Sequence, residues 1–72
     1  MKYFYYLSQY PGDSDVLVRI KARRKPGPHT QHRSGTWVIS ELEDGKWVMP
    51  GCPEVTLGTL ARCKYVGSME AK

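Results

Sequence analysis

Acidic side chains are missing from the middle of this 72-residue sequence. No Asp or Glu occurs between Val16 and Ser40, although the whole chain has seven of them against eleven Lys and Arg, for a formal net charge of +4. A basic balance is compatible with nucleic acid, anionic lipid or an acidic protein surface as a partner. The positive charge inside this acid-free window is therefore the first candidate for a functional surface.

Long hydrophobic runs are also missing. No stretch approaches the roughly 20 apolar residues that a membrane-spanning helix needs. The opening stretch Met1–Leu7 carries a lysine and an aromatic run, but it is too short and too rich in tyrosine for a signal peptide, and no small-residue cleavage site accompanies it. We therefore expect a cytoplasmic protein that does not bind membranes, in which Cys52 and Cys63 are reduced thiols.

Motifs for catalysis and metal binding are absent from the sequence. It has no glycine-rich phosphate cradle, and neither cysteine has the flanking sequence of a known nucleophile. By residue type the suitable zinc ligands are His29, His32, Cys52 and Cys63. The two histidines are closer together than the usual ligand spacing, and the two cysteines are too far apart for a C-x-x-C site. We expect a protein that is not an enzyme and that has no catalytic residue, no metal and no cofactor.

The short length limits what the chain can build. A domain of this size buries only about 60% of the surface that its unfolded chain exposes, which leaves no room for a deep cleft beside a core. The five Tyr, two Trp and several Val are typical of a folded β-rich domain and not of a disordered tail. We expect one small domain over residues 1–72.

The stretch from Val16 to Arg33 begins as a strand and ends as a basic loop. Apolar residues take alternate positions, at Val16, Val18, Ile20 and Ala22. The opposite face carries Leu17, Arg19, Lys21 and Arg23. This period of two predicts a strand with one buried face. Pro26-Gly27-Pro28 ends regular pairing, so residues 24–34 are interpreted as a mobile basic loop.

Two hairpins are predicted. Lys2–Ser8 forms the first strand, and Val16–Arg23 returns antiparallel to it. Asp44-Gly45 indicates a two-residue turn between Thr36–Glu43 and Lys46–Met49. The resulting register pairs Glu43 with Lys46, Leu42 with Trp47, Glu41 with Val48 and Ser40 with Met49. We assign the face of Val38, Leu42, Trp47 and Met49 to the core, so that Trp37 and Ile39 point the other way with Glu41 and Glu43.

The segment after Pro53 is ambiguous between helix and strand. A helical spacing joins Leu57, Leu60, Ala61 and Lys64 or Tyr65. Pro53 and Glu54 suit a first turn, and Arg62 and Lys64 suit a last one. Against a helix, Val55, Thr56, Gly58 and Thr59 are poor helix formers. A short helix within residues 55–64 is favoured over a strand at Val55–Ala61, and residues 68–72 are interpreted as a frayed tail. The predicted fold class is α+β: a small antiparallel sheet of about four strands in two hairpins, with one short C-terminal helix.

A cationic ridge is the main candidate for binding. Arg19, Lys21 and Arg23 project from one strand face at intervals of about 6.6 Å, close to twice the charge spacing of ~3.4 Å along one nucleic-acid strand. Tyrosines of the first strand can anchor a partner beside it, although in a small domain most of Tyr3, Tyr5, Tyr6, Tyr10 and Trp37 should be core. The ridge could instead be a solvated strand face that prevents aggregation. The candidate binding residues are Arg19, Lys21, Arg23, Arg24, Lys25, Arg33, Lys2, Tyr3 and Tyr5.

The chain resembles the small proteins that bacteriophages encode to redirect the transcription apparatus of their host. The resemblance rests on size, basic charge, β-rich character and the start with Lys2, Tyr3, Tyr5 and Tyr6, and it covers the whole chain. It implies a regulator that binds bacterial RNA polymerase and acts by inhibiting initiation or by antitermination. Two alternatives stay open: a module that binds DNA or RNA through the cationic strand and loop, and a protein inhibitor or adaptor of another target.

Overall fold

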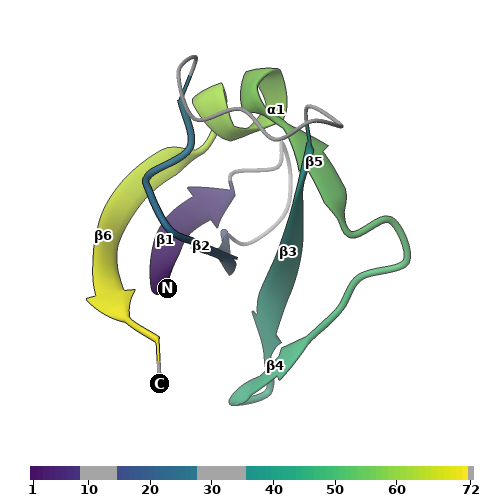
Figure 1. Cartoon of the computed structure of the whole chain (residues 1–72). Helices are drawn as coiled ribbons and strands as arrows, with labels where there is room; N and C mark the ends of the chain where they lie inside the picture. Colours follow the sequence, from purple (N-terminus) through teal and green to yellow (C-terminus); the bar gives the residue numbers. More distant parts are fainter. Residues whose placement is uncertain (9–14, 28–35, 72) are drawn as a thin grey trace.

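A computed structural model describes residues 1–8, 15–27 and 36–71 of the chain. These residues form six strands and one short helix (Figure 1), in the order β1 (Lys2–Ser8), β2 (Val16–Ala22), β3 (Thr36–Glu43), β4 (Lys46–Val48), β5 (Glu54–Thr56), α1 (Leu57–Ala61) and β6 (Lys64–Glu70). The sheet has the order β4-β3-β2-β1-β6, and β5 pairs with β3 off this path. A small antiparallel sheet with one short helix is confirmed. The expected count of about four strands is wrong, and the helix is followed by a strand.

The first hairpin forms as its alternation predicts. β1 and β2 pair antiparallel from Lys2 opposite Ala22 to Ser8 opposite Val16. Phe4 and Tyr6 of β1 and Val18 and Ile20 of β2 are buried, because these alternate positions point to the same side of the sheet. The predicted turn between the two strands lies outside the described residues.

The second hairpin has the predicted turn and most of the predicted register. Asp44 and Gly45 both have positive φ, at 50° and 78°, as a two-residue turn that matches the twist of the strands requires. Leu42 lies opposite Trp47, and the pairs on either side of it also follow the prediction. The pairing expected for Met49 does not form, because β4 ends at Val48.

The core face of β3 is the opposite of the one expected. Trp37 and Ile39 are buried, with 8% and 7% of their surface exposed, whereas Val38 is 52% exposed. Leu42 and Met49, also assigned to the core, are exposed. Both faces of β3 carry apolar side chains, so its own sequence does not decide between them. The neighbouring strand decides: Ile39 lies opposite Ile20, which belongs to the buried face of β2.

The segment 54–64 contains both a strand and a helix. β5 pairs with the first residues of β3, and α1 then begins at Leu57 with Thr56 as its N-cap, whose Oγ1 accepts a hydrogen bond from the N–H of Thr59 at 3.3 Å. Pro53 and Glu54 therefore precede the helix and are not in its first turn as expected. A side-chain cap supplied by threonine fixes the helix start after β5.

The expectation of a frayed tail is wrong as far as Glu70. β6 pairs antiparallel with β1 from Lys64 to Glu70, with a bulge at Val66. Tyr65 packs edge-on against Tyr6, with ring centroids 5.4 Å apart. An exposed ion pair of 3.8 Å between Lys2 and Glu70 contributes little to the stability of this pairing. The last strand therefore pairs with the edge of β1 that β2 leaves free.

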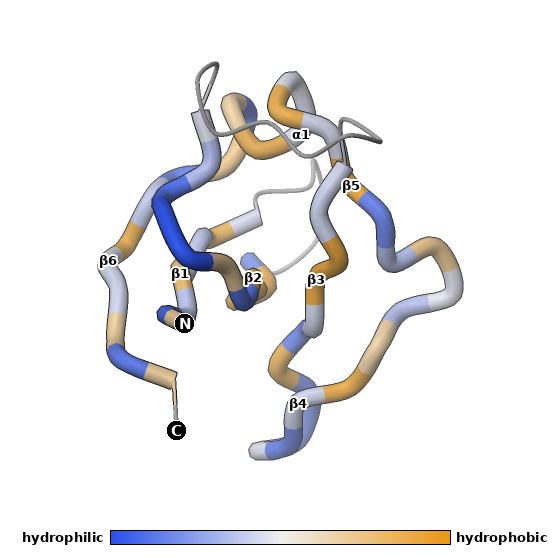
Figure 2. The backbone as a smooth tube through the Cα atoms, viewed as in Figure 1, coloured by the Kyte–Doolittle hydropathy of each residue, from blue (hydrophilic) through white to orange (hydrophobic). Residues whose placement is uncertain are grey.

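The core lies between the sheet and α1, which closes one end of it (Figure 1). Its buried members come from β1, β2, β3 and α1: Phe4, Tyr6, Val18, Ile20, Trp37, Ile39 and Leu60. After β2 the chain carries its most hydrophilic run, deep blue in Figure 2, before Pro26 returns to a buried position. The described part of the expected basic loop is therefore packed on the fold at Pro26, whereas residues 28–34 lie outside the described part.

Candidate binding surface

One side of the sheet, opposite the core, gathers aromatic and cationic side chains. Tyr3 of β1 lies opposite Lys21 of β2, and Tyr5 lies opposite Arg19. These positions alternate with the buried ones, so they share the outer face of the sheet. Trp47 of β4 contacts the same group, with its ring centroid 5.8 Å from that of Tyr5. We call these five residues the aromatic–cationic face.

Arg19 is held at the centre of this face. Its Cζ atom lies 4.1 Å from the ring centroid of Tyr3 and 4.1 Å from that of Trp47. Cation–π contacts contribute about 0.5–1 kcal/mol each at exposed sites and about 2 kcal/mol when water is excluded. Stacking uses the flat sides of the guanidinium, so its N–H donors point along its edges. The two rings thus restrict where this charged, multidentate donor lies before any partner arrives.

Two exposed apolar side chains extend the aromatic–cationic face on either side of β1 and β2. Met69 of β6 lies opposite Tyr3, and Leu42 of β3 lies opposite Trp47. Met69 is 65% exposed and Leu42 is 38% exposed. Met69 and Leu42 therefore add exposed apolar surface at two margins of the aromatic–cationic face.

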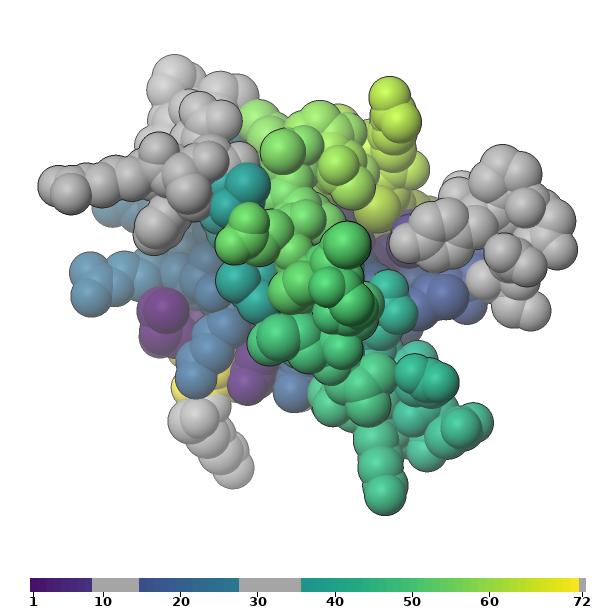
Figure 3. Space-filling model, turned by 90° about the vertical axis from the view of Figure 1, so that its right-hand side faces the viewer, coloured from purple at the N-terminus to yellow at the C-terminus, as the bar shows by residue number. Residues whose placement is uncertain are grey.

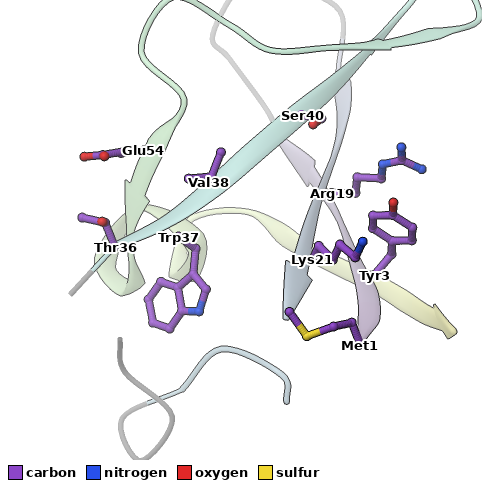
Figure 4. A pocket seen from close by; sticks show the side chains of 9 residues that line it. All are labelled: Met1, Tyr3, Arg19, Lys21, Thr36, Trp37, Val38, Ser40 and Glu54. Carbon is purple, nitrogen blue, oxygen red and sulfur yellow. The ribbon is translucent and has the colours of Figure 1, made fainter. Parts of the chain in front are cut away.

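A hollow of about 580 Å³ adjoins the aromatic–cationic face. It forms where β2 and β3 separate, since their pairing ends at Ile20 and Ile39. In Figure 3 residues of β1 and β2, in purple and blue, reach the surface beside the green residues that follow β3. The volume is within the ~300–1,000 Å³ typical of ligand sites. The hollow is lined by Met1, Tyr3, Arg19, Lys21, Thr36, Trp37, Val38, Ser40 and Glu54 (Figure 4).

The structure brings together four of the nine expected binding residues: Arg19, Lys21, Tyr3 and Tyr5. Lys2 lies at an alternate position on the other side of β1. Arg23 and Arg24 are exposed beyond the end of β2. Lys25 instead stacks on Tyr65, with its Nζ 3.9 Å from the ring centroid. Arg33 lies outside the described residues.

Trp47 is the member of the face that sequence reasoning missed. It was assigned to the core because it shares a face with Leu42, and that pairing is correct. The error came from choosing the wrong side of β3 as buried. The pairing of Ile39 with Ile20 puts Ser40 opposite Arg19. Ser40 and Leu42 share a face of β3, so Trp47, opposite Leu42, lies on the same face as Arg19.

A raised pKa marks one phenol of the core. Burial, with additional effects from Tyr65 and Cys63, raises the pKa of Tyr6 above 10.0. Its phenol is therefore neutral near pH 7, as suits a member of the core. The Sγ of Cys63 donates a weak hydrogen bond to the carbonyl of Thr59 at 3.5 Å, and Cys52 and Cys63 are free thiols.

Neither a metal-binding cluster nor a membrane-spanning helix occurs in the described residues. Within residues 1–8, 15–27 and 36–71, no three of His, Cys, Asp and Glu lie close enough together to hold a metal ion. None of the helical turns in these ranges is long and apolar enough to cross a membrane. Among known proteins, no family model, curated sequence or solved structure matches the chain.

Proposed function

We propose that this chain is a small cytoplasmic, non-enzymatic binding protein that docks on a protein partner through the aromatic–cationic face, and that the partner is bacterial RNA polymerase. One observation carries the docking proposal: the guanidinium of Arg19 lies against the rings of both Tyr3 and Trp47 on the outer, partly exposed face of the sheet. The choice of polymerase, and of a regulatory effect on initiation or termination, comes from the resemblance to phage transcription regulators.

The composition of the face favours a protein over a nucleic acid. Tyr, Trp, Met and Arg are the residues enriched in protein interfaces, and Tyr, Trp and Arg dominate their energetic centres. A guanidinium that is already oriented loses little conformational freedom on binding. The face has only two cations, Arg19 and Lys21. Two phosphate contacts would give a log–log salt slope of only about −1.8 on duplex DNA, much weaker than that of a protein making 6–10 contacts.

Binding to purified polymerase and to nucleic acid tests the proposal. Tagged protein would be titrated with nuclease-treated RNA polymerase and, in parallel, with labelled duplex and single strands at about 50 mM and about 200 mM salt. We expect binding to polymerase and none to either nucleic acid. Steep, salt-dependent binding to nucleic acid without polymerase would establish the alternative module, with Arg23 and Arg24 as further contacts. Binding to neither would overturn the polymerase proposal and leave an adaptor of another target.

A further inference from the structure

The hollow beside Arg19 results from the way β3 is shared between its neighbours. β3 pairs with β2 only as far as Ile39 and with β5 from Thr36 to Val38. The first residues of β3 therefore pair with β5 and not with β2. Lys21 of β2 has no β3 residue opposite it on the side that faces β3. The gap opens on the outer face of the sheet, next to the aromatic–cationic face.

The walls of the hollow differ in charge. Tyr3, Arg19 and Lys21 lie on one side of it in Figure 4, and Val38 lies on the other. Trp37 lies on the same side as Val38 in this view and keeps only 8% of its surface exposed. Glu54 is the one carboxylate among the lining residues, and in this view it points away from the two cations. The side next to β2 is therefore positive, and the other side combines the apolar Val38 and Trp37 with the polar Thr36, Ser40 and Glu54.

We infer that the hollow receives an extended segment of the protein partner with acidic residues at alternate positions and a bulky apolar residue beside them. This inference rests on the proposed function. Arg19 and Lys21 are two residues apart on a strand, a spacing of about 6.6 Å, which is also the spacing of alternate side chains in an extended ligand. Two carboxylates on one side of such a segment would meet the two cations.

The alternation of side chains in an extended segment also determines where the apolar residue stands relative to the acidic ones. In an extended segment only every second side chain faces the binding surface, so the apolar residue that enters the hollow stands two positions before or after the acidic pair. It would contact Val38, which is 52% exposed, and Trp37, which also lines the hollow. Side chains that fill a pocket near a fixed arginine are the usual energetic centre of a protein interface.

Short peptides test the pattern directly. The probes are Ser-Phe-Ser-Glu-Ser-Glu-Ser and its reversed sequence, with versions in which both Glu become Gln or Phe becomes Ala. Amide and indole chemical shifts of the labelled protein would be followed during titration. We expect shifts at Arg19, Lys21 and Trp37, and at least a tenfold weaker Kd for each altered peptide. Equal affinity for the Gln version, or shifts confined to other residues, would overturn the inference.

A variant in which the hollow is filled by a large side chain distinguishes a failure of this inference from a failure of the proposed function. Val38→Trp places a large side chain in the hollow, and Val66→Trp, at a similarly exposed position in β6, is the matched control. We expect Val38→Trp to abolish peptide binding and to weaken polymerase binding at least tenfold, and Val66→Trp to change neither. If polymerase binding needs Arg19 but tolerates Val38→Trp, the hollow is not the site and the docking face stands. If polymerase does not bind the unaltered protein, the proposed function fails, and the peptide titration alone decides whether the hollow takes an acidic segment.

Discussion

Replacing Arg19 with alanine should destabilise the fold as well as the binding surface. The guanidinium contacts two rings at 4.1 Å each, and Arg19 is only partly exposed. Two cation–π contacts at the lower end of their range, plus the packing of the side-chain stem, amount to about 1–2 kcal/mol. In a domain of this size, each kcal/mol lowers Tm by roughly 4–8 °C. Thermal unfolding followed by circular dichroism measures the loss.

The partner ring can be tested through a double-mutant cycle. Arg19→Ala, Trp47→Ala and the double variant should give a coupling free energy of about 0.5–1 kcal/mol, because each single change removes the same contact. Arg19→Lys should recover only part of the loss, since an ammonium keeps the charge but not the planar stack. Arg62→Ala, at an exposed arginine that follows α1, is the control and should stay within about 0.5 kcal/mol of the unaltered protein. A coupling of zero between Arg19 and Trp47 would refute the sandwich as an energetic unit.

Three further changes test the fold. Ile20→Ala should cost about 2–5 kcal/mol in urea unfolding, because Ile20 is 1% exposed in the core; a loss below 1 kcal/mol would contradict that placement. Gly45→Ala should cost about 1 kcal/mol, since Gly45 has φ of 78°, and an unchanged Tm would argue against the turn. The raised pKa of Tyr6 means that the stability it contributes is complete below pH 10.0 and is lost as pH rises through the folded pKa. Stability should thus fall more steeply between about pH 9 and about pH 11 in the unaltered protein than in Tyr6→Phe, and parallel curves would contradict the burial of this phenol.

Local patterns were sufficient for the hairpins and for four of the five residues of the aromatic–cationic face. The alternation in Val16–Ala22 separates Ile20 from Arg19, and the Asp44-Gly45 turn fixes the register of its own hairpin. Because Tyr3 and Tyr5 also alternate with buried residues, pairing β1 with β2 was enough to bring them beside the cations. Each of these features depends on residues that are close in sequence.

Features that depend on distant strands could not be read from the sequence. β3 has apolar side chains on both faces, and only its pairing with Ile20 decides that Trp37 and Ile39 are buried. β6 has a weak alternation interrupted by Gly67, and it forms because β1, at the other end of the chain, offers a free edge. The hollow depends on both effects, since it opens only where β3 leaves β2 for β5.

The affinity of RNA polymerase for Arg19→Ala, measured beside the unaltered protein and Arg62→Ala, tests the docking face most directly. Removing a fixed arginine from the centre of an interface should cost at least about 1.4 kcal/mol, or tenfold in Kd. We predict at least this loss for Arg19→Ala and less than a twofold change for Arg62→Ala. Equal affinity for all three proteins would show that the aromatic–cationic face is not where the polymerase binds.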